Sequence, residues 1–167
     1  VAAATVLPAG QANASRCGEQ VHPFGGKALL PFNVHSAVVM ADQAVDADLV
    51  FVSIGVNDLK NLHSTGRFRR ELAALLDAIL AAAPRARVCL LGIPPLDHFP
   101  AFPRPLADAL GWRGRVFDAI GVAAIQARER AFRIETAEPL GPEMFAGDGF
   151  HPSPTLHAAF ADAVLAG

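Results

Sequence analysis

Three short apolar runs, rich in β-branched and aromatic residues, constrain the fold of this chain more than any other feature. They span residues 48–54 (DLVFVSI), 87–93 (RVCLLGI) and 132–136 (FRIET). Runs of this length and composition are typical of buried strands. Each is followed by a segment with helical periodicity. Because strands that alternate with helices pair in parallel, the pattern predicts an α/β layered fold with a parallel sheet.

Apolar residues at helical spacing predict the helices. The first covers residues 67–83, and the second opens at Pro105, with Gly111 as a potential break. Ser153 as N-cap and Pro154 in the first turn predict the last helix. The apolar stripes of the first two helices consist of Phe68, Leu72, Leu75, Leu76, Ile79 and Leu80, and of Val116, Ile120, Ala124 and Ala127. In open parallel sheets functional groups gather at the carboxyl ends of the strands, so a site is expected in the loops there.

The chain of 167 residues fits one domain with a sizeable core, and its hydrophobic fraction of 52% excludes a disordered chain. Residues 1–44 are rich in Gly, Pro, Ala and His and show poor periodicity. We therefore distinguish an atypical N-terminal segment, residues 1–44, from an α/β domain, residues 45–167. Residues 1–14 are apolar and end in a small-x-small pattern. We interpret them as a truncated or atypical start, with a signal-peptide remnant as the alternative.

Charge and composition exclude several classes of protein. The formal net charge is −2 and no basic run exceeds two residues, which argues against a nucleic-acid partner. No apolar stretch approaches the roughly 20 residues that span a bilayer. Two cysteines, Cys17 and Cys89, are too few for a disulfide framework, and Cys89 is predicted to be a buried small hydrophobe. Neither the oligomeric state nor the compartment follows from the sequence; cytoplasmic and periplasmic or secreted locations both fit it.

A polar segment, residues 55–58 (GVND), directly follows the first predicted strand. Gly55 lets the backbone turn sharply and approach a ligand closely. The side-chain amide of Asn57 can donate to an oxyanion that develops during a reaction. The alternative is a strand-to-helix turn in which Asn57 and Asp58 serve only as local caps.

A second polar segment, residues 148–152 (DGFHP), precedes the last predicted helix. Asp148 and His151 are three residues apart and can meet on one turn. The carboxylate would then fix the imidazole tautomer and stabilise its cation, and His151 would act as general base and general acid. The alternative is an exposed loop that leads into a capped helix.

Together, in this order, the two segments resemble the SGNH (GDSL-type) hydrolase family. Residues 53–58 (SIGVND) are similar to its G-x-N-D block, residues 148–152 to its D-x-x-H-P block, and residues 91–100 (LGIPPLDHFP) to the strand and loop between them. The resemblance covers residues 45–167. It implies a flavodoxin-like three-layer α/β/α domain that hydrolyses small-molecule esters without a cofactor or metal. It also implies Asn57 as oxyanion donor, His151 as base and Asp148 as its orienting carboxylate.

The nucleophile of this family is the serine of a G-D-S block, and the chain has no Gly-Asp-Ser. The serines upstream of the GVND segment are Ser15, Ser36 and Ser53, of which Ser53 is predicted to be core. No segment before residue 45 matches the family's first strand or first helix. Three hypotheses follow: a fragment or misread start, which we favour, an inactive relative that binds a small molecule, or a relocated nucleophile at Ser15 or Ser36. A missing strand would expose an apolar sheet edge, so we also predict poor solubility.

Two further interpretations stay open. A metal site could draw on His22, His35, His63, His98, His151 and His157 with Asp97 and Asp148, although no pair has the spacing of an H-E-x-x-H or C-x-x-C motif. The segment 94–105 holds Phe99 and Phe102 and is either an apolar wall for an acyl chain or a stiff surface loop. A dinucleotide-binding role is disfavoured because no G-x-G-x-x-G follows a predicted strand.

Overall fold

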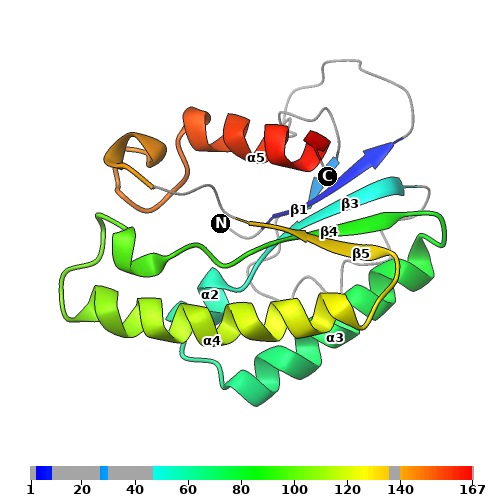
Figure 1. The fold of residues 1–167 in the computed structure, drawn as a ribbon, viewed down its shortest axis with the longest axis horizontal. Coiled ribbons are helices and arrows are strands. Elements are labelled where there is room, and N and C mark those ends of the chain that lie inside the picture. The colour runs from blue at the N-terminus through cyan, green and yellow to red at the C-terminus, as the bar shows by residue number, and fades with distance from the viewer. Residues whose placement is uncertain (1–2, 9–26, 30–46, 136–139, 167) are drawn as a thin grey trace.

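The structure is a computed structural model and describes residues 3–8, 27–29, 47–135 and 140–166. These residues form one five-stranded sheet with helices on both of its faces (Figure 1). Across the sheet the strands are β2 (Lys27–Leu29), β1 (Ala3–Pro8), β3 (Ala47–Ser53), β4 (Arg87–Leu91) and β5 (Ala131–Ile134). The helices are α2 (Val56–Lys60), α3 (Thr65–Ala82), α4 (Leu106–Gln126) and α5 (Pro154–Ala166). None of the helices in these described ranges is long and apolar enough to span a membrane.

The strands β3, β4 and β5 pair in parallel, which confirms the predicted α/β class. Helix α3 connects β3 to β4, and α4 connects β4 to β5. Both helices cover one face of the sheet, and α5 covers the other, so the molecule has three layers (Figure 1). This arrangement brings the carboxyl ends of the three parallel strands to the same edge.

The first two strands run against this pattern. Strand β1 pairs antiparallel with β3, from Ala3 opposite Ser53 to Pro8 opposite Ala47, and β2 pairs antiparallel with β1. The strand order is therefore that of a flavodoxin-like sheet, 2-1-3-4-5, with two of its strands reversed. A strand therefore lies beside β3 where the sequence predicted none, although it runs antiparallel to β3. Residues 3–8 lack the side-chain alternation typical of a strand, and their extended conformation comes from backbone pairing with β3. This pairing covers the edge of β3 that was expected to be exposed.

Side chains of the parallel strands alternate between the two faces, as the period of two requires. Val50 and Val52 of β3 and Val88 of β4 pack against α3 and α4, and none of them is more than 1% exposed. Phe51 and Cys89 point to the opposite face and pack with Phe160 and Ala163 of α5. Helices α3 and α4 contribute further large side chains to the core on their face of the sheet, among them Leu72, Leu75, Leu76, Ile79, Phe117 and Ile120.

Helix α4 continues through Gly111 without interruption, so the potential break predicted there is absent. A Cβ at this position would lie 2.7 Å from the carboxyl carbon of Asp97. The glycine therefore allows α4 to approach the 3₁₀ turn Leu96–His98, and the packing gained there offsets its low helix propensity. At the start of α5, Ser153 acts as the predicted cap, because its Oγ accepts from Leu156 N at 3.4 Å and donates to Glu143 O at 2.8 Å.

Two arginines hold the amino ends of β4 and β5 against the end of α3. Arg130, just before β5, donates to the carbonyls of Leu80, Ala83 and Ala86 at 3.0–3.2 Å. Arg128 donates to Asp77 Oδ1 at 2.8 Å and to the Ala73 carbonyl at 3.1 Å. Carbonyls at a helix C-terminus lack intrahelical partners, and the Arg130 guanidinium satisfies those of Leu80 and Ala83 at the end of α3. This arginine clamp lies at the edge of the sheet opposite the carboxyl ends.

Candidate active site

The GVND segment turns sharply at the carboxyl end of β3 and starts α2. Gly55 is the N-cap and has a left-handed backbone with φ of 106°. A Cβ there would lie 2.6 Å from Ile93 Cδ1 and 3.2 Å from the Phe68 ring, so both the backbone angle and the packing require glycine. The cap is Gly55 itself, and therefore the local-capping interpretation of Asn57 and Asp58 does not hold for α2.

Asn57 and Asp58 are two of the three buried polar residues that the structure describes. Asn57 is 8% exposed and Asp58 is not exposed at all. Asp58 Oδ1 lies 3.0 Å from His63 Nδ1, across the turn that ends α2. Burial of polar groups is costly unless they are hydrogen-bonded. The contact with His63 therefore offsets part of the cost of burying the Asp58 carboxyl group.

The DGFHP segment forms a tight turn in which Asp148 meets His151. The backbone N–H groups of Phe150 and His151 donate to Asp148 Oδ1 at 3.0 and 2.9 Å. The other oxygen, Oδ2, contacts His151 Nδ1 in a short hydrogen bond. Gly149 makes the turn possible, because its φ is +67° and a Cβ would come within 3.0 Å of Ala101 N.

These hydrogen bonds determine the charge of Asp148. The His151 ring and the two backbone N–H groups stabilise the carboxylate and hold the pKa of Asp148 well below its ordinary value of 3.8. The carboxylate is therefore ionised at neutral pH and oriented from both of its oxygens. His151 is partly exposed, with 45% of its side-chain surface accessible. With Nδ1 turned to Asp148, the remaining nitrogen Nε2 is the one that can exchange a proton with another group.

Two contacts connect this turn to other loops at the carboxyl ends of the strands. Lys60 Nζ, at the end of α2, lies 5.9 Å from the centre of the Phe150 ring. The Ala101 N–H donates to the Gly149 carbonyl at 3.1 Å. The GVND segment, the segment after β4 and the DGFHP turn thus meet at one edge of the sheet. The structure places the predicted residues Asn57, Asp148 and His151 on neighbouring segments.

Aromatic rings surround the same turn. Phe150 packs edge-on against the His151 ring at 5.1 Å and against Phe102 at 5.8 Å. Phe99 is 7% exposed and packs against Phe145 at 4.8 Å between ring centres. The segment 94–105 is therefore anchored in the core through Phe99, while Phe102 and Phe150 are only partly buried.

Three serines lie in the described residues, and each either ends a strand or caps a helix. Ser53 is the last residue of β3 and is half-buried, so the prediction that it belongs to the core was only partly right. Ser64 caps α3, where its Oγ accepts from Arg67 N at 3.2 Å. Ser153 bonds the Glu143 carbonyl. The other candidates for the nucleophile, Ser15 and Ser36, lie outside the described residues, as does Cys17.

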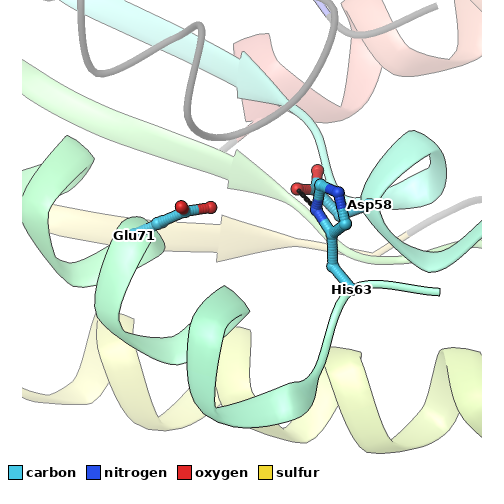
Figure 2. A group of neighbouring side chains, drawn as sticks. All are labelled: Asp58, His63 and Glu71. Carbon is cyan, nitrogen blue, oxygen red and sulfur yellow. Dashed lines mark hydrogen bonds and ion pairs between the residues drawn. The ribbon is translucent and has the colours of Figure 1, made fainter. Parts of the chain in front are cut away.

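The described residues also include a cluster of three potential metal ligands that was not predicted from the sequence. Asp58, His63 and Glu71 lie side by side, and one ligand atom from each is within 4.8 Å of the others (Figure 2). His63 was considered as a metal ligand, but the other two members were not. No spacing rule would have found them, since the group combines α2, the turn after it and α3. His98 and His157, in contrast, are exposed and are not part of this group.

Comparison with known proteins identifies the family to which the chain belongs. The profile of the GDSL-like Lipase/Acylhydrolase family matches residues 3–159. The chain therefore belongs to the GDSL-like lipase/acylhydrolase family, and this membership supports a hydrolase function. Among curated proteins, no sequence matches the chain at a significant level.

Several solved structures have the same fold. A protein described as a putative platelet activating factor from Streptococcus pneumonia has a TM-score of 0.68 at 14% identity, over 81% of this chain and 68% of that one. A GDSL-like lipase from Bacteroides thetaiotaomicron has a TM-score of 0.64 at 16% identity, over 80% and 69% of the two chains. A psychrotrophic esterase from Pseudoalteromonas has a TM-score of 0.58 at 16% identity, over 80% and 72%. The chain thus spans about two thirds of the length of these proteins.

Proposed function

We propose that this chain is a carboxylic ester hydrolase that acts through a serine, His151 and Asp148, with Asn57 as an oxyanion donor. The observation that carries the proposal is the Asp148–His151 pair. A carboxylate that bonds Nδ1 and is itself fixed by two backbone N–H groups is the arrangement that makes an imidazole an effective base at Nε2.

In the proposed reaction, His151 Nε2 removes the proton from a serine hydroxyl as the serine oxygen attacks the ester carbonyl carbon. The negative charge that develops on the carbonyl oxygen is stabilised by the Asn57 side-chain amide. Collapse of this intermediate breaks the bond to the alcohol, which leaves with the proton held by His151. A water molecule, activated by the same imidazole, then hydrolyses the acyl-serine and releases the acid. Asp148 stays ionised throughout and stabilises the imidazolium.

The nucleophile in this proposal is Ser36 or Ser15. Both precede the GVND segment in the chain, and Ser53, Ser64 and Ser153 have the structural positions given above. A small ester fits the surroundings best, because the partly buried Phe102 and Phe150 offer an apolar surface next to His151.

The test is labelling of the purified chain with a fluorophosphonate probe, followed by peptide mass spectrometry. We expect one labelled serine, Ser36 or Ser15, and loss of the label in His151→Ala. His157→Ala serves as the control, since His157 is an exposed histidine on α5, and it should label like the wild type. Labelling that persists in His151→Ala would show that the modified serine does not depend on this base and would refute the proposed mechanism.

A second candidate function is binding of a small ester or acid without turnover. One observation favours it: none of the three serines in the described ranges hydrogen-bonds His151, whose ring contacts Asp148 instead. Under this alternative the probe labels no serine, while an ester analogue still binds and protects the chain against thermal unfolding. Measured hydrolysis that His151→Ala abolishes would exclude it.

A further inference from the structure

We propose that Asp58, His63 and Glu71 form a binding site for a divalent transition metal, with Zn²⁺ as the reference ion. The three side chains come from α2, from the turn after it and from α3, and they converge on one point (Figure 2). This cluster is separate from the Asp148–His151 pair, and the inference does not depend on the proposed hydrolysis.

The geometry is close to that of a bound ion. Two ligands of one tetrahedral Zn²⁺ lie about 3.4 Å apart, because each lies about 2.1 Å from the metal. His63 Nδ1 and Asp58 Oδ1 are already 3.0 Å apart. The ligand atoms of the whole cluster lie within 4.8 Å of one another, so a rotation that moves the Glu71 carboxylate by about 1.5 Å would complete a three-ligand site.

The chemistry of the donors selects the class of ion. One imidazole nitrogen and two carboxylate oxygens suit Zn²⁺ and neighbouring transition ions, whereas Ca²⁺ and Mg²⁺ prefer oxygen ligands alone. The two carboxylates also supply two negative charges for a divalent cation. Asp58 is completely buried and His63 and Glu71 are only 16% and 19% exposed, so an ion there would be largely shielded from water.

The surroundings hold the ligands without blocking the site. Arg113 donates from its guanidinium to the backbone carbonyl of His63 and so fixes the position of that residue. Arg67 Nε bonds Glu71 Oε1 at 2.9 Å, and its side chain is 41% exposed. Arg67 is the more exposed partner of this pair, so its flexible side chain can turn towards solvent when an incoming cation takes its place at the carboxylate.

An ion at this position would tie together three segments at the carboxyl end of β3. Asp58 follows Asn57 directly in α2, so the ion would also restrict the position of the amide that we propose as oxyanion donor. We therefore expect the first effect of the ion to be on stability rather than on a chemical step.

The test is isothermal titration of the whole chain, freed of metal by dialysis against EDTA, with ZnCl₂. We expect one Zn²⁺ per chain and a rise in melting temperature on binding. Glu71→Gln and His63→Ala should each weaken the affinity more than about tenfold, since loss of even an outer partner of a metal site costs 10- to 100-fold. The matched controls, Glu129→Gln and His98→Ala, change exposed residues outside the cluster and should bind like the wild type.

Titration with Co²⁺ gives a readout of geometry, because a tetrahedral site with a nitrogen ligand produces strong visible absorption. This absorption should disappear in Glu71→Gln, a variant of the same size that keeps the fold even if His63→Ala does not. Absence of Zn²⁺ binding, or binding that is equal in Glu71→Gln and Glu129→Gln, would refute the site. Binding lost in His98→Ala instead would assign the metal to an exposed histidine and refute it as well.

Discussion

His151 Nδ1 hydrogen-bonds Asp148 Oδ2 across a single turn, and the second oxygen of that carboxylate is held by two backbone N–H groups. The pair is thus fixed by local structure and needs no partner from elsewhere in the fold. A histidine oriented in this way has a defined tautomer before any substrate arrives.

Asp148→Asn tests this pair directly. We expect kcat for p-nitrophenyl acetate to fall by about 10²- to 10⁴-fold with little change in KM, because the amide cannot stabilise the imidazolium. Asp162→Asn is the control, since Asp162 is an exposed aspartate on α5. Equal activity of the two variants would contradict the role of Asp148.

The lowered pKa of Asp148 leads to a second prediction. Hydrogen bonds from the His151 ring and the backbone lower the pKa of this carboxyl below 3.8, so its contribution to stability is fully present above that pH and is lost as the pH falls through the lowered value. Between pH 7 and pH 4, Asp148 should therefore keep its charge. Carbon-13 NMR of the labelled carboxyl measures this, and a midpoint at or above 3.8 would show that the pair is not formed in solution.

Asn57→Ala tests the oxyanion donor. Loss of one such donor lowers kcat by about 10²- to 10³-fold, and we expect a decrease of this size with KM nearly unchanged. Asn61→Ala, four residues later and exposed, should retain full activity. Circular dichroism must show that both variants are folded. If Asn57→Ala were folded and fully active, the oxyanion would have to be stabilised by other groups.

Cys89 should be chemically inert in the native protein. It is completely buried between β3, β5 and α5, and burial raises the pKa of its thiol to about 12. The reactive thiolate is then almost absent at pH 8. Iodoacetamide should modify Cys89 only after unfolding in guanidinium chloride, as peptide mass spectrometry would show separately from Cys17. Rapid modification of Cys89 in the native chain would contradict this burial.

Asp118 of α4 should contribute strongly to stability. Its Oδ1 accepts from the Ile93 N–H at 2.9 Å, and both of its oxygens bond Arg133 of β5 at 2.8 Å. Asp118→Ala leaves the partly buried Arg133 without this partner, and we expect a loss of about 1.5–3 kcal/mol in the free energy of unfolding. Asp108→Ala removes an exposed pair with Arg104 and should cost at most about 1 kcal/mol. Denaturant unfolding of both variants measures the difference, and equal losses would contradict the prediction.

The parallel half of the fold was predictable because its elements are long and periodic. Strand β3 and helix α3 begin and end within two residues of the predicted bounds, since their apolar residues repeat with the period of a strand or a helix. The candidate groups after β3 and before α5 were predictable for a related reason. The carboxyl ends of parallel strands meet at one edge, so their order along the chain indicates their position in space.

The antiparallel strand and the metal-ligating cluster were not predictable in this way. Strand β1 owes its conformation to backbone pairing with β3, and backbone pairing leaves no mark on the side-chain pattern. Asp58 and Glu71 come near each other only through the path of the chain between α2 and α3, and the spacing of 13 residues between them reflects that path rather than a motif. Gly111 was wrongly predicted as a potential break in α4. Its role is to allow close contact with Asp97, a residue distant from it in the sequence, so the sequence alone does not reveal it.

The arginine clamp has a consequence for how this protein can change. Arg128 and Arg130 secure the strands at their amino ends, whereas the loops with the candidate reactive groups lie at the opposite edge. Replacement of the segment 94–105 or of the turn around Phe150 leaves every one of these clamp bonds intact. For the ester hydrolase proposed above, we therefore expect loop exchange at one end of the sheet to change the preferred ester, while the bonds at the other end keep the strands in place.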